Sequence, residues 1–315
     1  MKKNIAKFFA FVISLSVISS CSVVFPSNEQ WQNSNEKFSD RYEKPIISGN
    51  IESPEITESS GIAASRCNEN VFWTHNDSGD DAFIFAFNEK GKNLGTWKVS
   101  GAKNIDWEDI ATRKEKSGTC FLYIGEIGNN ALKRGEFTVY RVEEPAVSNE
   151  NKSSNRKNPL KTEPAETIKF IYPDTRHDAE TLLVHPETGD IYVLTKGLSS
   201  AAGVYKLKAN YSLEKTNTLE KIADLAVPSI PNGLLTSGDI SPDGRRVIVC
   251  DYFNAYEIIL PEKAKNFDEI WMQKLETVEL GTRELGEAVG YSADGKSIFA
   301  TSEKKKSPLI QVKQK

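Results

Sequence analysis

Short apolar runs separated by turn-forming residues recur along most of the chain, and this spacing predicts β-strands. Five times the chain repeats a polar start with an acid nearby, an apolar strand, a turn and a second apolar strand. Strand-filled repeats of roughly 40–50 residues are typical of β-propeller blades. The copies start 48, 72, 58 and 49 residues apart, at Ser60, Glu108, Glu180, Gly238 and Glu287. The pattern predicts an all-β fold, a single β-propeller domain over residues 45–315.

Within the first three blades, β-branched and aromatic runs bounded by turn-formers mark the individual strands. They cover 61–65, 71–75, 83–87 and 96–99 in blade one, 109–112, 120–124, 137–142 and 167–172 in blade two, and 182–184, 191–195, 203–208 and about 221–226 in blade three. One turn recurs between the first and second strands of the last three blades, at 185–190, 241–244 and 292–295. In the last two, Asp-Gly supplies the positive φ of a tight hairpin.

The ends of the propeller indicate how the ring closes. The last apolar strand, 309–312, leaves blade five without a fourth strand, and 45–56 has no partner of its own. We therefore predict that an N-terminal strand closes the last blade. The repeats indicate five blades, with six as the alternative if 45–58 and 228–235 contain a degenerate blade. Residues 145–166, rich in Asn, Ser, Lys and Glu, are predicted to be a disordered surface insertion.

The N-terminus is typical of an exported lipoprotein. Lys2, Lys3 and Lys7 precede an apolar run, 8–18, that is shorter than the roughly 20 residues needed to span a bilayer. Residues 18–21 then resemble the bacterial lipobox, which predicts a signal peptide over 1–20, lipidation of Cys21 and a flexible tether over 21–44. The alternative is an ordinary signal peptide. The predicted location is the cell envelope, at the outer membrane where the bacterium has one, with the lipid as the sole membrane contact.

Charge and cysteine content narrow the classes of function. Without residues 1–20 the chain has 37 basic and 44 acidic residues, a net charge near −7, which argues against nucleic-acid binding. Only three histidines occur, which argues against a His-rich metal centre. Cys67 and Cys120 are predicted on the same face of neighbouring blades, either as a disulfide or as two separate thiols. Cys250, inside an apolar strand, is predicted to be a core residue.

Acidic residues recur at the positions where first strands begin and second strands end. In a propeller the first strands line the central channel, so both positions are expected at one channel mouth. Hard oxygen ligands favour Ca²⁺. The predicted metal ligands are Glu108, Glu180, Glu287, Asp239 and Glu58. The predicted ligand-binding residues are Asn76, Asp77, Asp106, Asp109, Asp178, Glu126, Lys196, Asp251 and Glu303. In the alternative interpretation, these acids cap backbone amides or are solvated.

Two of the three histidines are expected on the same face as the acids. His75 begins the segment His75-Asn76-Asp77, and His177 precedes Asp178. An imidazole near neutral pH is the usual general acid or base, so these two are the candidate catalytic residues. His185 lies in a hairpin turn at the other end of its blade and is predicted to be structural. No nucleophile elbow, phosphate-binding loop or dinucleotide motif is present in the sequence.

The segments 60–66, 73–79, 104–111 and 178–183 resemble a group of bacterial exported propeller proteins of undefined function. More distantly, Asp106-Trp107-Glu108-Asp109-Ile110-Ala111 is similar to the strand-start acids of esterase-like phytase and calcium-dependent lactonase propellers. This second resemblance implies a calcium ion at the channel mouth and hydrolysis of esters or phosphoesters. The chain departs from those enzymes because it lacks an obvious full ligand set and a phosphate-binding cluster of basic residues.

Three functions therefore follow as hypotheses. The leading hypothesis is a lipid-anchored envelope propeller that binds a small ligand or an envelope protein at an acidic mouth loaded with Ca²⁺. The second is a metal-dependent hydrolase of esters, lactones or phosphoesters, in which His75 or His177 would carry the proton. The third is a scaffold for protein assembly, which would need no ion.

Overall fold

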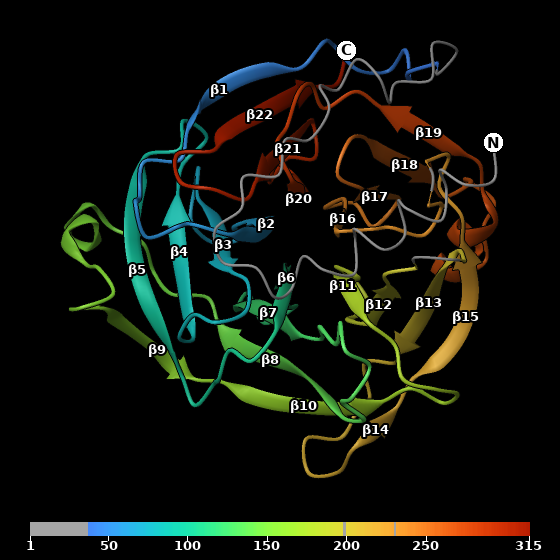
Figure 1. The fold of residues 1–315 in the computed structure, drawn as a ribbon, viewed down its shortest axis with the longest axis horizontal. Helices are drawn as coiled ribbons and strands as arrows, with labels where there is room; N and C mark the ends of the chain where they lie inside the picture. Colours follow the sequence, from blue (N-terminus) through green and yellow to red (C-terminus); the bar gives the residue numbers. More distant parts are fainter. Residues whose placement is uncertain (1–36, 198–199, 230) are drawn as a thin grey trace, which may run out of the picture. The chain divides into compact units, whose positions relative to one another are not determined.

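The chain folds into a five-bladed β-propeller (Figure 1). The computed structural model describes residues 37–197, 200–229 and 231–315. The predicted signal peptide, Cys21 and the first part of the predicted tether lie outside the described residues. The five sheets surround a common centre, and each first strand lies beside the first strands of the neighbouring blades. No helix among the described residues is long and apolar enough to cross a membrane.

Each blade has four antiparallel strands that follow one another along the chain, interrupted only by the edge strands β9 and β14; blade five takes its fourth strand from the N-terminus. Blade one contains β2 (Ser59–Ala64), β3 (Phe72–Asn76), β4 (Phe83–Phe87) and β5 (Asn93–Ser100). Blade two contains β6 (Trp107–Lys114), β7 (Cys120–Glu126), β8 (Phe137–Glu143) and β10 (Glu166–Ile171). Blade three contains β11 (Ala179–Val184), β12 (Ile191–Thr195), β13 (Ala202–Leu207) and β15 (Glu220–Leu225).

The last two blades follow the same order. Blade four contains β16 (Ser237–Ile240), β17 (Arg246–Cys250), β18 (Ala255–Ile259) and β19 (Leu275–Val278). Blade five contains β20 (Gly286–Tyr291), β21 (Ser297–Ser302), β22 (Pro308–Lys313) and β1 (Ile46–Asn50). In Figure 1 the blue β1 lies beside the red β22, with which it pairs antiparallel. The five-blade count and the closing N-terminal strand are therefore confirmed, and the six-blade alternative is wrong.

The segment 145–166 is ordered, so the prediction of a disordered insertion was wrong. It contains a 3₁₀ helix, η2 (Asn149–Ser153), and β9 (Leu160–Pro164), which pairs parallel with β5 at the outer edge of blade one. The outer strand of a blade presents unpaired backbone groups, and β9 satisfies them. Because one side of such a strand faces water, its polar composition is compatible with a sheet edge. A two-residue strand, β14 (Asn217–Thr218), extends blade two in the same way.

The predicted tether is not flexible throughout, because its last part packs on the propeller. Tyr42 is buried and its hydroxyl donates to Oε1 of Glu257 on β18 at 2.6 Å. Arg41 contacts Oε2 of the same carboxylate at 2.8 Å. Glu257 is fully buried, and a buried carboxylate needs such partners to offset the loss of its hydration. Residues 37–44 are therefore held by blade four and, through the backbone bond from Glu43 to Lys313, by blade five, which the polar sequence did not predict.

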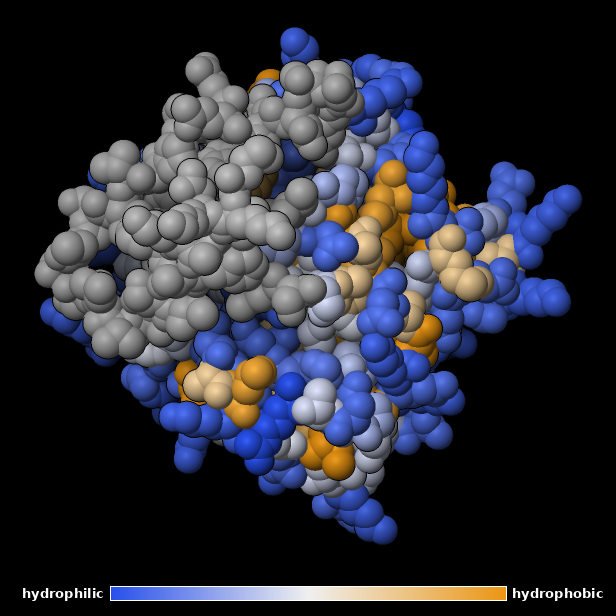
Figure 2. Space-filling view, turned by 45° about the vertical axis from the view of Figure 1, so that its right-hand side comes forward, coloured by the Kyte–Doolittle hydropathy of each residue, from blue (hydrophilic) through white to orange (hydrophobic). Residues whose placement is uncertain are grey.

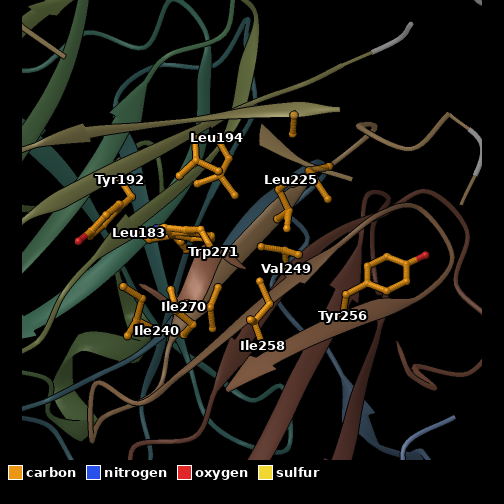
Figure 3. Close-up of a cluster of buried hydrophobic side chains, with 14 of the residues drawn as sticks. Leu183, Tyr192, Leu194, Leu225, Ile240, Val249, Tyr256, Ile258, Ile270 and Trp271 are labelled. Atoms are coloured by element: carbon orange, nitrogen blue, oxygen red, sulfur yellow. The ribbon is translucent and has the colours of Figure 1, made fainter. Parts of the chain in front are cut away.

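The core lies between neighbouring blades. Figure 3 shows one such cluster, in which Leu183 and Leu194 of blade three pack with Val249 and Ile258 of blade four. Trp271, from the 3₁₀ helix η3 (Phe267–Met272), belongs to the same cluster. Each fully buried side chain of this size contributes about 1.5–3 kcal/mol relative to exposure. On the face shown in Figure 2 hydrophilic residues predominate, with smaller groups of hydrophobic side chains between them.

Two cysteines connect neighbouring blades covalently. The structure joins Cys67, in the turn after β2, to Cys120, the first residue of β7, in a disulfide. The sequence left open a disulfide or two separate thiols, and the structure has the disulfide. Cys250 is a free, fully buried thiol on β17, which agrees with its predicted place in the core.

Candidate functional site

Four blades carry a β-bulge at the start of the first strand. In β6, for example, Trp107 pairs with Glu126 and Asp109 with Gly125, so Glu108 has no partner of its own. Bulges redirect the side chain of the extra residue, and they are frequent next to functional sites. The bulged residues of blades one, two, three and five are Ser60, Glu108, Glu180 and Glu287. The three glutamates predicted from the repeat are therefore structurally equivalent.

Blade four differs from the other blades, and its register corrects the sequence alignment. The pairing of β16 with β17 is continuous from Ser237 to Ile240. Counted back from the shared hairpin turn, the residue equivalent to Glu180 is Thr236, while Gly238 lies two residues further along. Asp239, predicted as a metal ligand, accepts hydrogen bonds from the backbone N–H groups of Ile240 at 2.8 Å and Tyr291 at 2.9 Å. Asp239 therefore connects blades four and five.

Asp109, predicted to bind a ligand, instead holds the blades together at the centre of the ring. Its carboxylate accepts hydrogen bonds from the backbone N–H of Leu182 at 3.0 Å and of Gly238 at 3.2 Å. It also accepts from the hydroxyl of Ser237 at 3.1 Å and from the N–H of Ile110 at 2.9 Å. A Cβ on Gly61 of blade one would lie 2.5 Å from this carboxylate. Asp109 thus contacts three other blades.

The residues predicted at the second-strand ends divide into two sets with different roles. Asn76, Glu126 and Asp251 occupy equivalent positions and bind nearby loops. Asn76 accepts from the N–H of Thr57 at 2.9 Å, Glu126 from the N–H of Ile105 at 2.8 Å, and Asp251 from the N–H of Phe253 at 2.8 Å. Each of these three side chains therefore caps a backbone N–H group of a nearby loop.

The residue that follows the second-strand position of Asn76, Glu126 and Asp251 lies near the bulge glutamates in four of the blades. Asp77, Lys196 and Glu303 occupy this position in blades one, three and five, and Tyr252 occupies it in blade four. The electrostatic neighbours of these groups are the glutamates of the bulges: Asp77 acts on Glu108, and Lys196 acts on Glu180 and Glu287. We call the following residues the acidic mouth: Glu108, Glu180, Glu287, Asp77, Lys196, Tyr252, Glu303, Asp106, Asp178 and Glu58.

Three carboxylates of the acidic mouth converge most closely. Asp77, Asp106 and Glu108 each place an oxygen within 4.8 Å of the others. Asp77 follows β3 of blade one, whereas Asp106 and Glu108 begin blade two. Gly128 makes room for them, because a Cβ there would lie 2.0 Å from Oε1 of Glu108 and 2.5 Å from Cγ of Asp106. Of the predicted trio of Glu108, Glu180 and Glu287, only Glu108 belongs to this closest group.

Glu180 has a different partner. Its Oε1 forms an ion pair with the ammonium group of Lys196, which also donates to the hydroxyl of Tyr252 at 3.0 Å. The second oxygen, Oε2, is buried without a hydrogen-bond partner among the described residues. Glu108 and Glu287 are buried residues, 4 % and 8 % exposed, and their carboxyl groups accept no hydrogen bond from a described residue. The acidic mouth therefore contains at least one buried carboxyl oxygen, Oε2 of Glu180, that no described residue satisfies.

The crowding of acids raises their pKa values. Burial, and then the charges of Asp77 and Asp178, raise the pKa of Asp106 to about 7. Burial raises the pKa of Glu180 to about 7 even though Lys196 opposes the shift. Burial and the charge of Asp77 raise the pKa of Glu303 to about 7. The pKa of Glu108 is well above its ordinary value for the same reasons, burial first and then the charge of Glu180.

Two further predicted residues lie at the rim. Asp178 accepts a hydrogen bond from the N–H of Asn129 at 2.6 Å, and burial raises its pKa. Glu58 pairs with Glu303 in an isolated bridge, and burial followed by the charge of Asp77 raises its pKa. Both residues belong to the electrostatic surroundings of the convergent carboxylates.

Neither histidine lies among the mouth carboxylates. His75 is fully buried against the ring of Trp107, with ring centroids 5.6 Å apart, and burial lowers its pKa to about 4. Nε2 of His177 lies 3.0 Å from Oδ1 of Asp174 and 2.9 Å from the hydroxyl of Tyr205. The imidazole of His177 therefore packs between blades two and three.

Neither a protein-family model nor a curated protein sequence matches the chain.

Sequence reasoning missed three residues of the site: Gly128, Tyr252 and Thr236. Tyr252 follows the predicted strand end at Asp251 by one residue, so the alternation of side chains along a strand was the available signal. Thr236 was missed because the repeat was aligned on Asp239 and not on the hairpin turn. Gly128 carries no signal in the sequence, since its role depends on the two carboxylates packed against it.

Proposed function

We propose that the protein binds Ca²⁺ at the acidic mouth and there binds a small ligand or an envelope protein. The observation that carries this proposal is the convergence of Asp77, Asp106 and Glu108, whose oxygens lie within 4.8 Å of one another. Calcium ligands lie about 2.3–2.6 Å from the ion, so ligands on opposite sides are about 5 Å apart. One calcium ion can therefore contact all three carboxylates.

The type of ligand atom supports calcium over softer metals. All three donors are carboxylate oxygens, which hard cations prefer, whereas Zn²⁺ and copper sites usually include His or Cys. Magnesium needs shorter bonds of about 2.0–2.1 Å and a stricter octahedral arrangement. The buried Oε2 of Glu180, which has no partner among the described residues, is an independent sign that the mouth lacks positive charge.

Binding is better supported than hydrolysis. The hydrolase hypothesis assigned proton transfer to His75 or His177, and neither imidazole lies among the mouth carboxylates. A hydrolase would then need another proton carrier at the mouth. A scaffold without an ion would leave Oε2 of Glu180 buried without a partner among the described residues, at a cost in stability.

The cellular location belongs to the same proposal. Lipidation of Cys21 would attach the protein to a membrane of the cell envelope, with residues 22–36 as the spacer before the docked segment at 37–44. The acidic composition of the chain supports a ligand or protein partner over nucleic acid. Metabolic labelling with a fatty acid tests the lipid anchor, and unlabelled protein would contradict it.

Removal of calcium is expected to lower the melting temperature of the purified protein. A ligand that binds only the folded state stabilises it by about 2.7 kcal/mol at 100 times its dissociation constant. Glu108→Gln, which keeps the size of the side chain but removes its charge, should abolish most of this response. Thermal melting in calcium and in chelator measures it.

The matched control is Glu220→Gln, which removes one exposed carboxylate on β15, far along the chain from the mouth residues. This variant should respond to calcium as the wild type does. If the wild type melts at the same temperature in calcium and in chelator, the calcium proposal is wrong.

Calcium affinity is expected to rise with pH between about 5.5 and 8, because the ion displaces protons. Asp106, Glu180 and Glu303 have pKa values of about 7 in the folded protein. Their unfolded pKa values are near 4, so the calcium-free folded state binds more protons and loses stability as the pH rises through about 7. Calorimetric titration at several pH values, in buffers of different ionisation enthalpy, measures affinity and proton release. An affinity that does not change over this range would contradict the proposal.

A further inference from the structure

Lys196 is placed where its charge acts on most of the acidic mouth. Its side chain is 13 % exposed and its ammonium contacts both the carboxylate of Glu180 and, at 3.0 Å, the hydroxyl of Tyr252. Burial raises the pKa of six mouth acids, and the positive charge of Lys196 opposes this rise at each of them: Asp77, Glu108, Asp178, Glu180, Glu287 and Glu303. Residues of blades three and four thus contact the ammonium group directly, and Glu287 of blade five is close enough to interact with it electrostatically.

Some of the oxygen atoms near the ammonium group of Lys196 form no hydrogen bond with it. Oε2 of Glu180, a residue that is 4 % exposed, has no hydrogen-bond partner among the described residues. Glu287 is 8 % exposed as a residue, and its carboxyl group accepts no hydrogen bond from a described residue. An ammonium group offers three hydrogen bonds, whereas a calcium ion takes six to eight oxygen ligands and carries twice the charge. This part of the mouth therefore has more oxygen ligands than a lysine needs.

We propose that the ammonium of Lys196 occupies a second cation position, formed by Glu180, Glu287 and Tyr252, and thereby limits the mouth to one calcium ion. The inference rests on the proposed calcium site at Asp77, Asp106 and Glu108. Because the lysine is covalently held, its position is filled at every calcium concentration. Only the site between blades one and two then responds to calcium, and Lys196 determines the number of ions bound.

The test is the number of calcium ions bound when the side chain is removed. Lys196→Ala takes away the ammonium and its four-carbon stem, which leaves space for an ion and its waters. Isothermal titration of the full mature chain with calcium should give one ion for the wild type and two for Lys196→Ala. Lys196→Arg, which keeps the charge, is the matched control and should bind one. Butylammonium, which mimics the lost side chain, should compete with the second ion in Lys196→Ala alone.

Each outcome decides the proposal. If Lys196→Ala binds the same number of ions as the wild type, or if Lys196→Arg gains an ion, the second cation position does not exist. If the wild type binds none and Lys196→Ala binds one, the position exists and the site at Asp77, Asp106 and Glu108 is wrong. The proposal also requires that calcium can replace the ammonium. A Lys196→Ala protein that stays unfolded by circular dichroism even in millimolar calcium would overturn it.

Discussion

Replacing Asp109 by alanine is expected to lower the free energy of unfolding by about 4 kcal/mol. The substitution leaves the backbone N–H groups of Leu182 and Gly238 buried and without their acceptor. Each buried N–H that loses its partner costs about 1–3 kcal/mol, which for two such groups gives the expected value. Because these donors belong to blades three and four, the loss should weaken the ring and not one blade alone. Urea unfolding of the wild type and the variant measures the difference.

A graded control separates this role from a general effect of buried acids. Asp239 is also buried, but the hydrogen bonds that its carboxyl group accepts come from Ile240 of blade four and Tyr291 of blade five, one blade fewer than for Asp109. Asp239→Ala should therefore destabilise the protein less than Asp109→Ala. If both variants lose the same free energy of unfolding, the additional bonds of Asp109 to other blades contribute no stability. A loss below about 1 kcal/mol for Asp109→Ala would contradict its central role.

Removal of the disulfide is expected to cost roughly 4 kcal/mol, the chain-entropy value for a closed loop of this length. The bridge joins Cys67 and Cys120 across 53 residues and connects blade one to blade two. In its absence the unfolded chain gains conformational freedom, while the folded blades keep their packing. Urea unfolding of the Cys67→Ser/Cys120→Ser double variant measures the loss.

Reduction of the wild type provides the control for this prediction. A reducing agent should destabilise the wild type by the same amount and leave the double variant unchanged. If the double variant and the wild type unfold at the same urea concentration without reductant, the bridge does not stabilise the protein. Cys250 stays a thiol in both proteins, so any effect of the reductant cannot arise from it.

Repetition explains why the architecture was predictable. Each blade must bury its faces against its neighbours, so strand, turn and strand recur at nearly fixed spacing. Strands such as β4 (Phe83–Phe87) and β12 (Ile191–Thr195) match the predicted ranges residue for residue. The closing strand β1 was predictable because blade five lacked a fourth strand. The ordered structure of 145–166 was not predictable, because nothing in its polar sequence indicates that β9 pairs with the edge strand β5.

The candidate site was predictable as a region but not as a set of contacts. The recurrence of Glu108, Glu180 and Glu287 indicated one mouth, and the bulges confirm that the three are equivalent. The roles within the mouth followed from side-chain direction, which alternates along a strand. Glu126, at the end of the second strand of blade two, caps a loop. The position one residue further along, which Lys196 occupies in blade three, lies among the acids.

The sequence alone determined the fold class, the five blades and the acidic end of the ring, because these depend on local patterns that repeat. The tertiary structure decided which acids meet. Asp77 and Asp106 come from different blades, and the distance between their carboxylates depends on how two sheets pack. It also decided that His75 is buried against Trp107 and that Asp109 bonds to the backbone of other blades. Contacts between blades are fixed by packing across the ring, and no local pattern of residues encodes them.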